Sequence, residues 1–362
     1  METRNLGRSG LQVSVVGLGT NNFGRRMDAA ATAVVVNQCL DSGITLFDTA
    51  DIYGGEGRSE QFLGKVLKGR RQQAVIATKF SGPMGEGPMR SGGSRRYIME
   101  AVEDSLRRLG TDYIDLYQIH FPDPKTPQEE TLRALDDLVR AGKIRYIGNS
   151  NHAGWQIADA AWIARSEHLT PYISVQNQYS LLDRRIEAEV VPAAQAFGLS
   201  ILPFFPLASG LLTGKYRRGA DAPAGTRLSA GPQAQRLLVD SNFDVVEALT
   251  KFAESHGHTL LELAFSWLAS KPYIGSVIAG ATKPEQVDQN VASASWELSA
   301  EELEALRRRD VGLLYVIGVN GQLLMHFAAM CGMAWPDYIE AMKEGVRRHG
   351  PVRAGIYAMV KD

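Results

Sequence analysis

The sequence predicts an α/β protein built on a single closed (β/α)8 (TIM) barrel. Eight short apolar or β-branched runs alternate with longer segments of helical period along the 362 residues, and no break in composition divides them. The predicted strands are residues 13–18, 44–47, 74–78, 114–119, 144–148, 173–176, 200–205 and 276–279. Such an alternation is typical of parallel strands joined by helices, and eight units are the number that closes a barrel.

Helical periodicity between the strands supports this prediction. One apolar stripe with spacings of three and four falls within residues 98–109 and another within residues 132–139. Gly43, Gly142 and Gly198 each follow a helical pattern and precede a strand, where a left-handed helix stop belongs. A doubly wound sheet is the rival fold. It usually carries G-x-G-x-x-G after an early strand, whereas "GLGTNNFG" places its third glycine too late.

Two segments fall outside the repeating pattern of the barrel. The opening "RNLGRSGLQVSVVG" predicts a β-hairpin ahead of the barrel, with its turn at residues 7–10. The longest irregular stretch, residues 214–240, is long enough to be functional.

Composition and charge exclude several classes of protein. The 39 basic and 40 acidic residues are well mixed, so no clustered basic excess points to nucleic acid or to an anionic membrane surface. Cys39 and Cys331 are the two cysteines, and their spacing fits neither a disulfide framework nor a zinc site. The N-terminus has no apolar signal core, and polar residues interrupt the most apolar run, residues 311–335. We therefore expect a cytoplasmic protein without a metal.

The stretch "LFDTADIYG" shows where the chemistry is expected, because a buried strand here runs straight into polar residues. In such barrels the functional groups follow the carboxyl ends of the strands. Asp48 and Tyr53 follow the second predicted strand, Lys79 the third and His120 the fourth. Each residue alone has an ordinary structural explanation, as a turn former, a packing residue or a solvated charge. Their common position at one barrel end favours a joint function.

Acid–base chemistry explains this particular set of four residues. A tyrosine with a pKa near 10 is a weak acid at neutral pH, and a nearby ammonium such as Lys79 is expected to lower that pKa. Asp48 would supply the counter-ion of a buried Lys79, and His120 would orient a substrate oxygen. The set is that of a proton donor aimed at a carbonyl group. Asp51 lies out of phase with it and is predicted to be a loop residue.

The sequence resembles the aldo-keto reductase superfamily, in its potassium-channel β-subunit-like branch. The segments "FDTADIYG", "ATKF", "LYQIHFPD", "IGNSN", "VQNQYSLL", "PLASGLLTGKY" and "IAGATKPEQVDQN" carry the likeness, which covers about residues 4–309. The resemblance implies a (β/α)8 barrel, NADPH-dependent reduction of an aldehyde or ketone, and no metal. It also implies that Tyr53 is the proton donor, that Lys79 and Asp48 tune it, and that His120 orients the carbonyl.

The resemblance also implies a set of cofactor-binding residues. Beside the nicotinamide it places Gly19, Thr20, Asp48, Ser150, Asn151, Gln176, Phe204 and Phe205, and beside the pyrophosphate Pro206, Leu207, Ser209, Leu211 and Lys215. Around the adenosine phosphate it places Gly280, Thr282, Lys283, Gln286, Gln289 and Asn290, with Arg227 as a further clamp. Phe205 stands where a small serine is common, and Gln289 where glutamate is common. Lys283, a cation beside a predicted helix N-terminus, favours NADPH over NADH.

Two other functions compete with a reductase. The first is a nucleotide-sensing regulatory subunit with little turnover, because potassium-channel β subunits share the barrel and the four residues. The second is a sugar-phosphate lyase or isomerase, whose phosphate would also bind after the last two strands and in which Lys79 would form a Schiff base. A neighbouring Asp48 argues against the second, because it keeps the amine charged.

Residues 310–362 differ from the usual ending of the family, so we divide the chain into a barrel, 1–309, and a C-terminal extension. A helical pattern runs over residues 336–349 of the extension. Three roles fit it: a cap over the substrate pocket, an oligomer contact rich in methionine, or a helix packed on the barrel. The expected partner is a small carbonyl substrate, with neither nucleic acid nor membrane. The sequence leaves the identity of the substrate, the direction of reaction and homo-oligomerisation open.

Overall fold

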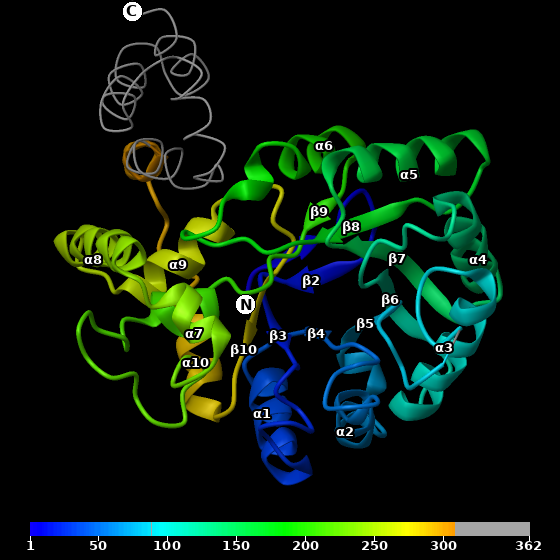
Figure 1. The fold of residues 1–362 in the computed structure, drawn as a ribbon, viewed down its shortest axis with the longest axis horizontal. Coiled ribbons are helices and arrows are strands. Elements are labelled where there is room, and N and C mark those ends of the chain that lie inside the picture. The colour runs from blue at the N-terminus through cyan, green and yellow to red at the C-terminus, as the bar shows by residue number, and fades with distance from the viewer. Residues whose placement is uncertain (88, 308–362) are drawn as a thin grey trace, which may run out of the picture. The chain divides into compact units, whose positions relative to one another are not determined.

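The computed structural model describes residues 1–87 and 89–307 of the chain (Figure 1). The chain divides into two compact units, Met1–Trp296 and Glu297–Asp362. In the second unit, residues 300–307 are helical. The predicted boundary after residue 309 and the predicted helix over residues 336–349 lie outside the described residues.

The first unit is a (β/α)8 barrel, as predicted. Eight parallel strands pair in the order β10-β3-β4-β5-β6-β7-β8-β9. Their bounds are β3 (Val16–Gly19), β4 (Leu46–Asp48), β5 (Val75–Phe80), β6 (Ile114–Ile119), β7 (Ile144–Ser150), β8 (Tyr172–Gln176), β9 (Ser200–Ile201) and β10 (Val277–Gly280). Backbone hydrogen bonds next to the two outer strands close the barrel: Ile201 N–H donates to Tyr273 O (2.7 Å), and Gly275 N–H donates to Ile201 O (3.0 Å).

Helices surround the strands (Figure 1). Their bounds are α1 (Ala29–Asp41), α2 (Arg58–Leu67), α3 (Arg95–Leu109), α4 (Gln128–Arg140), α5 (Gly154–Ser166), α6 (Val190–Phe197), α7 (Pro232–Leu237), α8 (Asp240–Ser255), α9 (Leu260–Ala269) and α10 (Pro284–Ala292). On α3, the predicted apolar stripe from Ile98 to Leu109 is buried. Gly43, Gly142 and Gly198 have φ of 78°, 75° and 73°, so the three predicted left-handed helix stops are confirmed.

The predicted hairpin closes the amino ends of the strands. β1 (Thr3–Asn5) pairs antiparallel with β2 (Gln12–Ser14), and Leu6 and Val13 lie in the fully buried core. Gly7, in the hairpin turn, has φ of 58°, and a Cβ there would lie 2.2 Å from the carbonyl oxygen of Ile173. Only glycine fits this contact, which holds the hairpin against the start of β8.

Two predicted segments differ in detail from the structure. The run over residues 13–18 is one apolar stretch in the sequence, but it is shared between β2 and β3. The chain leaves the hairpin at Val15, whose N–H donates to Glu2 O (3.0 Å), and only then enters the barrel. The long irregular stretch over residues 214–240 contains α7. No helix in the described part of the chain is long and apolar enough to cross a membrane.

Candidate active site

Four polar side chains meet at the carboxyl ends of neighbouring strands. Asp48 is the last residue of β4, Lys79 lies near the end of β5, and His120 follows β6. Tyr53 lies in the turn after β4, where its N–H donates to Ala50 O (3.1 Å) and brings it back toward the barrel. Parallel strands end at one edge, which is why residues far apart in sequence come together here.

A buried ion pair lies at the centre of the group. The Lys79 ammonium donates to both Asp48 carboxylate oxygens (2.8 and 2.7 Å) and to Thr49 O (2.8 Å), so all three of its protons are used. The side chains are 0% and 4% exposed. Burial lowers the pKa of Lys79, but Asp48, Tyr53 and the hydrogen bonds outweigh it and leave that pKa raised. Lys79 therefore stays charged.

Tyr53 lies beside this ammonium and is partly buried. The Lys79 nitrogen is 5.2 Å from the centroid of the Tyr53 ring. Burial raises the pKa of Tyr53, Lys79 lowers it and Asp48 raises it again, with a net rise. Lys79 lowers the pKa of Tyr53 as expected, but burial outweighs this single cation and the net change is a rise. Tyr53 carries its proton at neutral pH.

His120 is an uncharged imidazole. Its ring meets the Tyr53 ring edge-on, with 5.8 Å between centroids and 79° between planes, and stacks on Phe121 at 4.3 Å. Burial, followed by the charge of Lys79, lowers the pKa of His120 to about 3. Its Nδ1 is buried without a hydrogen-bond partner among the described residues. A neutral ring keeps one N–H that it can donate.

The residues predicted to hold the nicotinamide carboxamide converge on the same group. Gln176, at the end of β8, donates from Nε2 to Asp48 Oδ1 (2.8 Å), and Ser150 Oγ donates to Gln176 O (2.8 Å). Asn151 has φ of 59° and donates from Nδ2 to His120 O (3.0 Å). Asparagine tolerates this left-handed conformation better than most residues.

The end of β3 touches the group from the other side. Gly19 pairs with Asp48, and the N–H and hydroxyl of Thr20 both donate to Asp48 O (2.9 and 3.0 Å). Arg227 reaches this loop and donates to the side-chain oxygens of Asn21 and Asn22 (3.1 and 3.0 Å). Burial and the nearby charges of Arg26 and Arg25 lower the pKa of Arg227.

The segment after β9 adopts an unusual backbone. Phe205, Ala208 and Ser209 have φ of 51°, 45° and 61°, and the last two lie in the short 3-10 helix η3 (Ala208–Thr213). Phe205 meets the ring of Phe204 edge-on at 5.3 Å. The other predicted pyrophosphate residues follow in the same turn: Pro206 and Leu211 are buried, Leu207 is partly buried, and Lys215 is exposed.

The predicted adenosine-phosphate residues gather at the end of β10 and in α10. Gly280 pairs with Gly19 in the barrel. Thr282 N–H donates to Gln286 Oε1 (2.8 Å), and Lys283 occupies the N-cap position of α10. Asn290 is buried, whereas Lys283 and Gln289 are exposed. The positive end of α10 and the exposed ammonium of Lys283 thus lie together after β10.

Comparison with known proteins gives the family. The model of the aldo/keto reductase family matches residues 15–310. The chain belongs to the aldo/keto reductase family. It is 38% identical over 300 residues to a protein of Oryza sativa subsp. japonica named "Probable voltage-gated potassium channel subunit beta", covering 80% of this chain and 90% of that one.

Other aldo/keto reductase relatives carry the names of enzymes. "Aldo-keto reductase YhdN" of Bacillus subtilis is 35% identical over 309 residues, or 83% of this chain and 91% of its own. "L-glyceraldehyde 3-phosphate reductase" of Escherichia coli is 33% identical over 303 residues, or 80% and 87%. The chain is an oxidoreductase of this family, which generally uses nicotinamide cofactors. A second family model, "Aromatic-ring-opening dioxygenase LigAB, LigA subunit", matches residues 286–347.

Two residues of this aldo/keto reductase site escaped the sequence analysis. Gln118 on β6 donates from Nε2 to Asp48 Oδ1 (3.4 Å). The sequence pattern could have predicted this position, because Gln118 and His120 are two residues apart and lie on one face of the strand. Asp51, predicted to be a loop residue, is only 1% exposed. Its N–H donates to Lys79 O (3.2 Å), so the turn continues beside β5 and buries the side chain.

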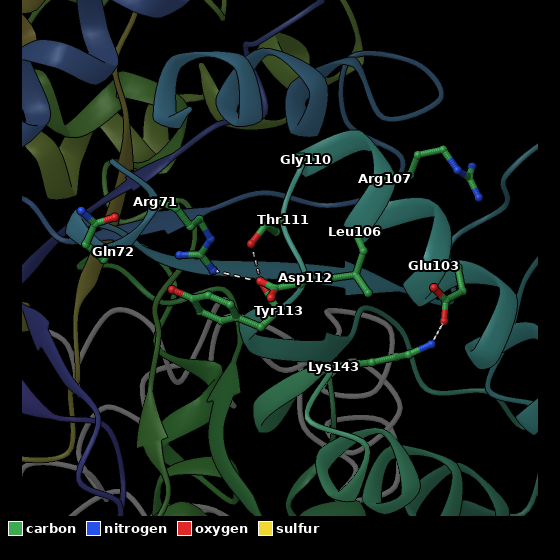
Figure 2. A pocket seen from close by; sticks show the side chains of 10 residues that line it. All are labelled: Arg71, Gln72, Glu103, Leu106, Arg107, Gly110, Thr111, Asp112, Tyr113 and Lys143. Atoms are coloured by element: carbon green, nitrogen blue, oxygen red, sulfur yellow. Dashed lines mark hydrogen bonds and ion pairs between the residues drawn. The ribbon is translucent and has the colours of Figure 1, made fainter. Parts of the chain in front are cut away.

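The structure also has a surface groove of about 1040 Å³ away from this site (Figure 2). Arg71, Tyr113 and Lys143, which line it, precede β5, β6 and β7, at the amino ends of the strands. Arg71 pairs with Asp115 (2.6 Å), and Lys143 pairs with Glu103. These two ion pairs occupy the charges of Arg71, Lys143 and Glu103.

Replacing Asp48 by Asn tests the buried pair. The variant leaves the Lys79 ammonium without its counter-ion inside the barrel, and we expect a loss of about 3–5 kcal/mol in the free energy of unfolding. The double variant Asp48→Asn/Lys79→Met removes both charges and is expected to recover most of that loss. Urea unfolding of the three proteins measures the effect. A single variant as stable as the parent would contradict the pairing.

Proposed function

We propose that the protein is a cytoplasmic NADPH-dependent reductase that converts an aldehyde or ketone to an alcohol. The observation that carries the proposal is a charged, buried Lys79 bound to Asp48 beside a protonated Tyr53 and a neutral His120. Both groups that face a substrate oxygen are uncharged proton donors. A carbonyl oxygen that gains negative charge as it is reduced needs such donors.

The residues around the site fit a nicotinamide nucleotide. Gly19 and Gly280 stand side by side without side chains, and the helix N-terminus of α10 opens just beyond them. This arrangement lets a backbone approach a phosphate closely. Ser150, Asn151 and Gln176 would hold the carboxamide. When bound, the reduced nicotinamide supplies the hydride that the carbonyl carbon receives.

The protein's own residues would complete the reaction. His120 would donate a hydrogen bond to the carbonyl oxygen and orient it. Tyr53 would transfer its phenolic proton to that oxygen as the carbon is reduced, which leaves a phenolate. The Lys79 ammonium would stabilise the phenolate, and Asp48 keeps Lys79 charged and in place.

A lyase or isomerase that uses Lys79 as a nucleophile fits less well. A Schiff base needs an uncharged amine, but the pKa of Lys79 is raised and its protons are all donated. Borohydride with a sugar phosphate should therefore trap no adduct. A nucleotide-sensing subunit is the second candidate, because the rice relative carries the name of a channel subunit. Catalytic turnover of a carbonyl substrate distinguishes a reductase from such a sensor.

Replacing Tyr53 by Phe tests the proton donor. We expect kcat for aldehyde reduction to fall by about 10²- to 10⁴-fold, because the general acid is lost. The nucleotide affinity should stay unchanged. Steady-state kinetics and a fluorescence titration with NADPH measure the two quantities. Tight NADPH binding without turnover in the parent protein would favour the sensor, and binding of neither nucleotide would reject the proposal.

Replacing Lys283 by Gln tests the preference for NADPH. Lys283 is exposed at the N-cap of α10, where a cation favours the extra 2′-phosphate. We expect the Kd for NADPH to rise about tenfold while the Kd for NADH changes little. Lys251→Gln, an exposed lysine on α8, is the control. Equal losses for both nucleotides would show that Lys283 does not recognise the 2′-phosphate.

We propose further that the substrate is an aldehyde that carries a carboxylate. Arg25, Arg26 and Arg227 place three cations in one region, and Arg227 lies close enough to Tyr53 for an ionised phenol to interact with its charge. The similarity of residues 286–347 to a ring-opening dioxygenase subunit suggests a source. When such an opening cleaves between a hydroxyl-bearing and a hydrogen-bearing carbon, its product contains both a carboxylate and an aldehyde.

A ring-opened acid aldehyde and its methyl ester test this substrate class. We expect kcat/KM to be about tenfold higher for the acid, because charge-assisted contacts to arginine are lost in the ester. The ratio of kcat/KM for the acid to that for the ester should be smaller in the double variant Arg25→Ala/Arg26→Ala. Steady-state kinetics on both compounds give the ratio. Equal kcat/KM values in the parent protein would reject an anionic substrate without touching the reductase proposal.

A further inference from the structure

Asp51 is a buried carboxyl group without a counter-ion of its own. It lies in the turn that carries Tyr53, two residues away, and is 1% exposed. No described side chain donates a hydrogen bond to either carboxylate oxygen, and the N–H of the adjacent Ile52 stabilises the charged form only in part. Burying an unpaired charge is costly, so an isolated carboxyl group in this place takes up a proton instead.

The neighbours of Asp51 explain why no counter-ion is available. Glu60, on α2, is fully buried and accepts from Thr78 Oγ1 (2.6 Å) and from Arg108 Nε (2.6 Å). Arg108 is thereby committed to Glu60. Lys79 is committed to Asp48 in the same way. The charged groups around Asp51 form two complete pairs, and an Asp51 carboxylate would be a surplus negative charge.

Three tyrosines complete the surroundings of Asp51: Tyr53 in the same turn, Tyr97 on α3 and Tyr117 on β6. None of them supplies a positive charge. Burial and the negative charge of Glu60 raise the pKa of Asp51 to about 8, while Arg108, the Ile52 N–H and Lys79 act in the opposite direction without outweighing them. At neutral pH the carboxyl group is mostly protonated.

We propose that Asp51 is a positioning residue of the reductase: it is an uncharged acid in the working enzyme, and its ionisation slows proton donation by Tyr53. The proposal rests on the proposed function. An ionised Asp51 adds a negative charge beside Tyr53, which raises the pKa of the phenol and makes it a weaker acid. The same charge repels Glu60 and competes for Lys79 and Arg108, which hold the surrounding elements together.

The pH profile of reduction tests this role. In the parent protein we expect kcat to fall about threefold or more in a step near pH 8, below the loss that deprotonation of Tyr53 itself causes. Asp51→Asn fixes the side chain in an uncharged form, so its kcat should pass through this range without the step. Asp41→Asn, an exposed residue at the end of α1, is the matched control and should keep the step. A step of equal size in Asp51→Asn would overturn the proposal.

A second measurement does not depend on activity. The pKa of Asp51 in the folded protein, about 8, lies above its ordinary value of 3.8, so protonation stabilises the fold. That stabilisation is complete below the ordinary value and is lost as pH rises through the folded value. The urea midpoint of the parent should therefore fall more than that of Asp51→Asn from pH about 6 to about 9. Parallel curves would overturn the proposal even if the protein reduces no carbonyl.

If Asp51→Asn does not fold, infrared spectroscopy of the parent protein can determine the protonation state of Asp51. A protonated carboxylic acid has its own carbonyl stretch, and we expect this band at neutral pH and its loss as the pH passes about 8. Absence of the band at neutral pH would show that Asp51 is ionised and would reject the proposal. If Asp51 titrates as expected but no carbonyl compound is reduced, the reductase function fails and the ionisation stands.

Discussion

The arrangement of the active site depends on one ion pair inside the barrel. Lys79 is fully buried, so its charge requires compensation, and Asp48 supplies it through two hydrogen bonds. The pair joins β4 to β5. Gln118 from β6 and Gln176 from β8 fix the same Asp48 oxygen, so four strands determine where the ammonium lies. The position of this cation in turn decides what Tyr53 and His120 can do.

Burial and charge act on the two proton donors in different ways. For Tyr53 they oppose each other, and burial prevails, so the phenol keeps its proton. For His120 they act together, since both disfavour a second positive charge beside Lys79. The result is a site with one buried ion pair and two neutral donors beside its cation. Such a site stabilises a developing oxyanion without presenting an anion to a substrate oxygen.

Much of this arrangement could be predicted from the sequence. The alternation of apolar runs and helical segments gave all eight barrel strands, and parallel strands bring the residues after them to one edge. For that reason Asp48, Lys79 and His120 were found without knowledge of any contact. Gln118 could have been found in the same way from its phase on β6.

The features that sequence reasoning missed depend on tertiary contacts. The burial of Asp51 depends on the packing of its turn beside β5, where its N–H donates to Lys79 O, and no local pattern encodes that contact. The direction of the pKa shift of Tyr53 depends on how deeply the phenol is buried, whereas the sequence shows only which charged residue is near. The split of residues 13–18 between hairpin and barrel depends on Val15 N–H bonding to Glu2 O. In each case the outcome depends on contacts with residues from other parts of the sequence.

Backbone strain gathers in the segments assigned to the cofactor. Four of the eight non-glycine residues with positive φ in the described chain lie there: Asn151, Phe205, Ala208 and Ser209. Each such conformation costs about 1–3 kcal/mol and persists only where contacts impose it. Gln176 O and His120 O hold Asn151, and the Gln233 amide donates to Ser209 Oγ (2.7 Å). Phe205 bears this strain with a large side chain, whose ring meets that of Phe204 edge-on. The Arg227 guanidinium lies 5.8 Å from the centroid of the Phe205 ring and donates to Asn21 and Asn22, so it joins this strained turn to the loop after β3.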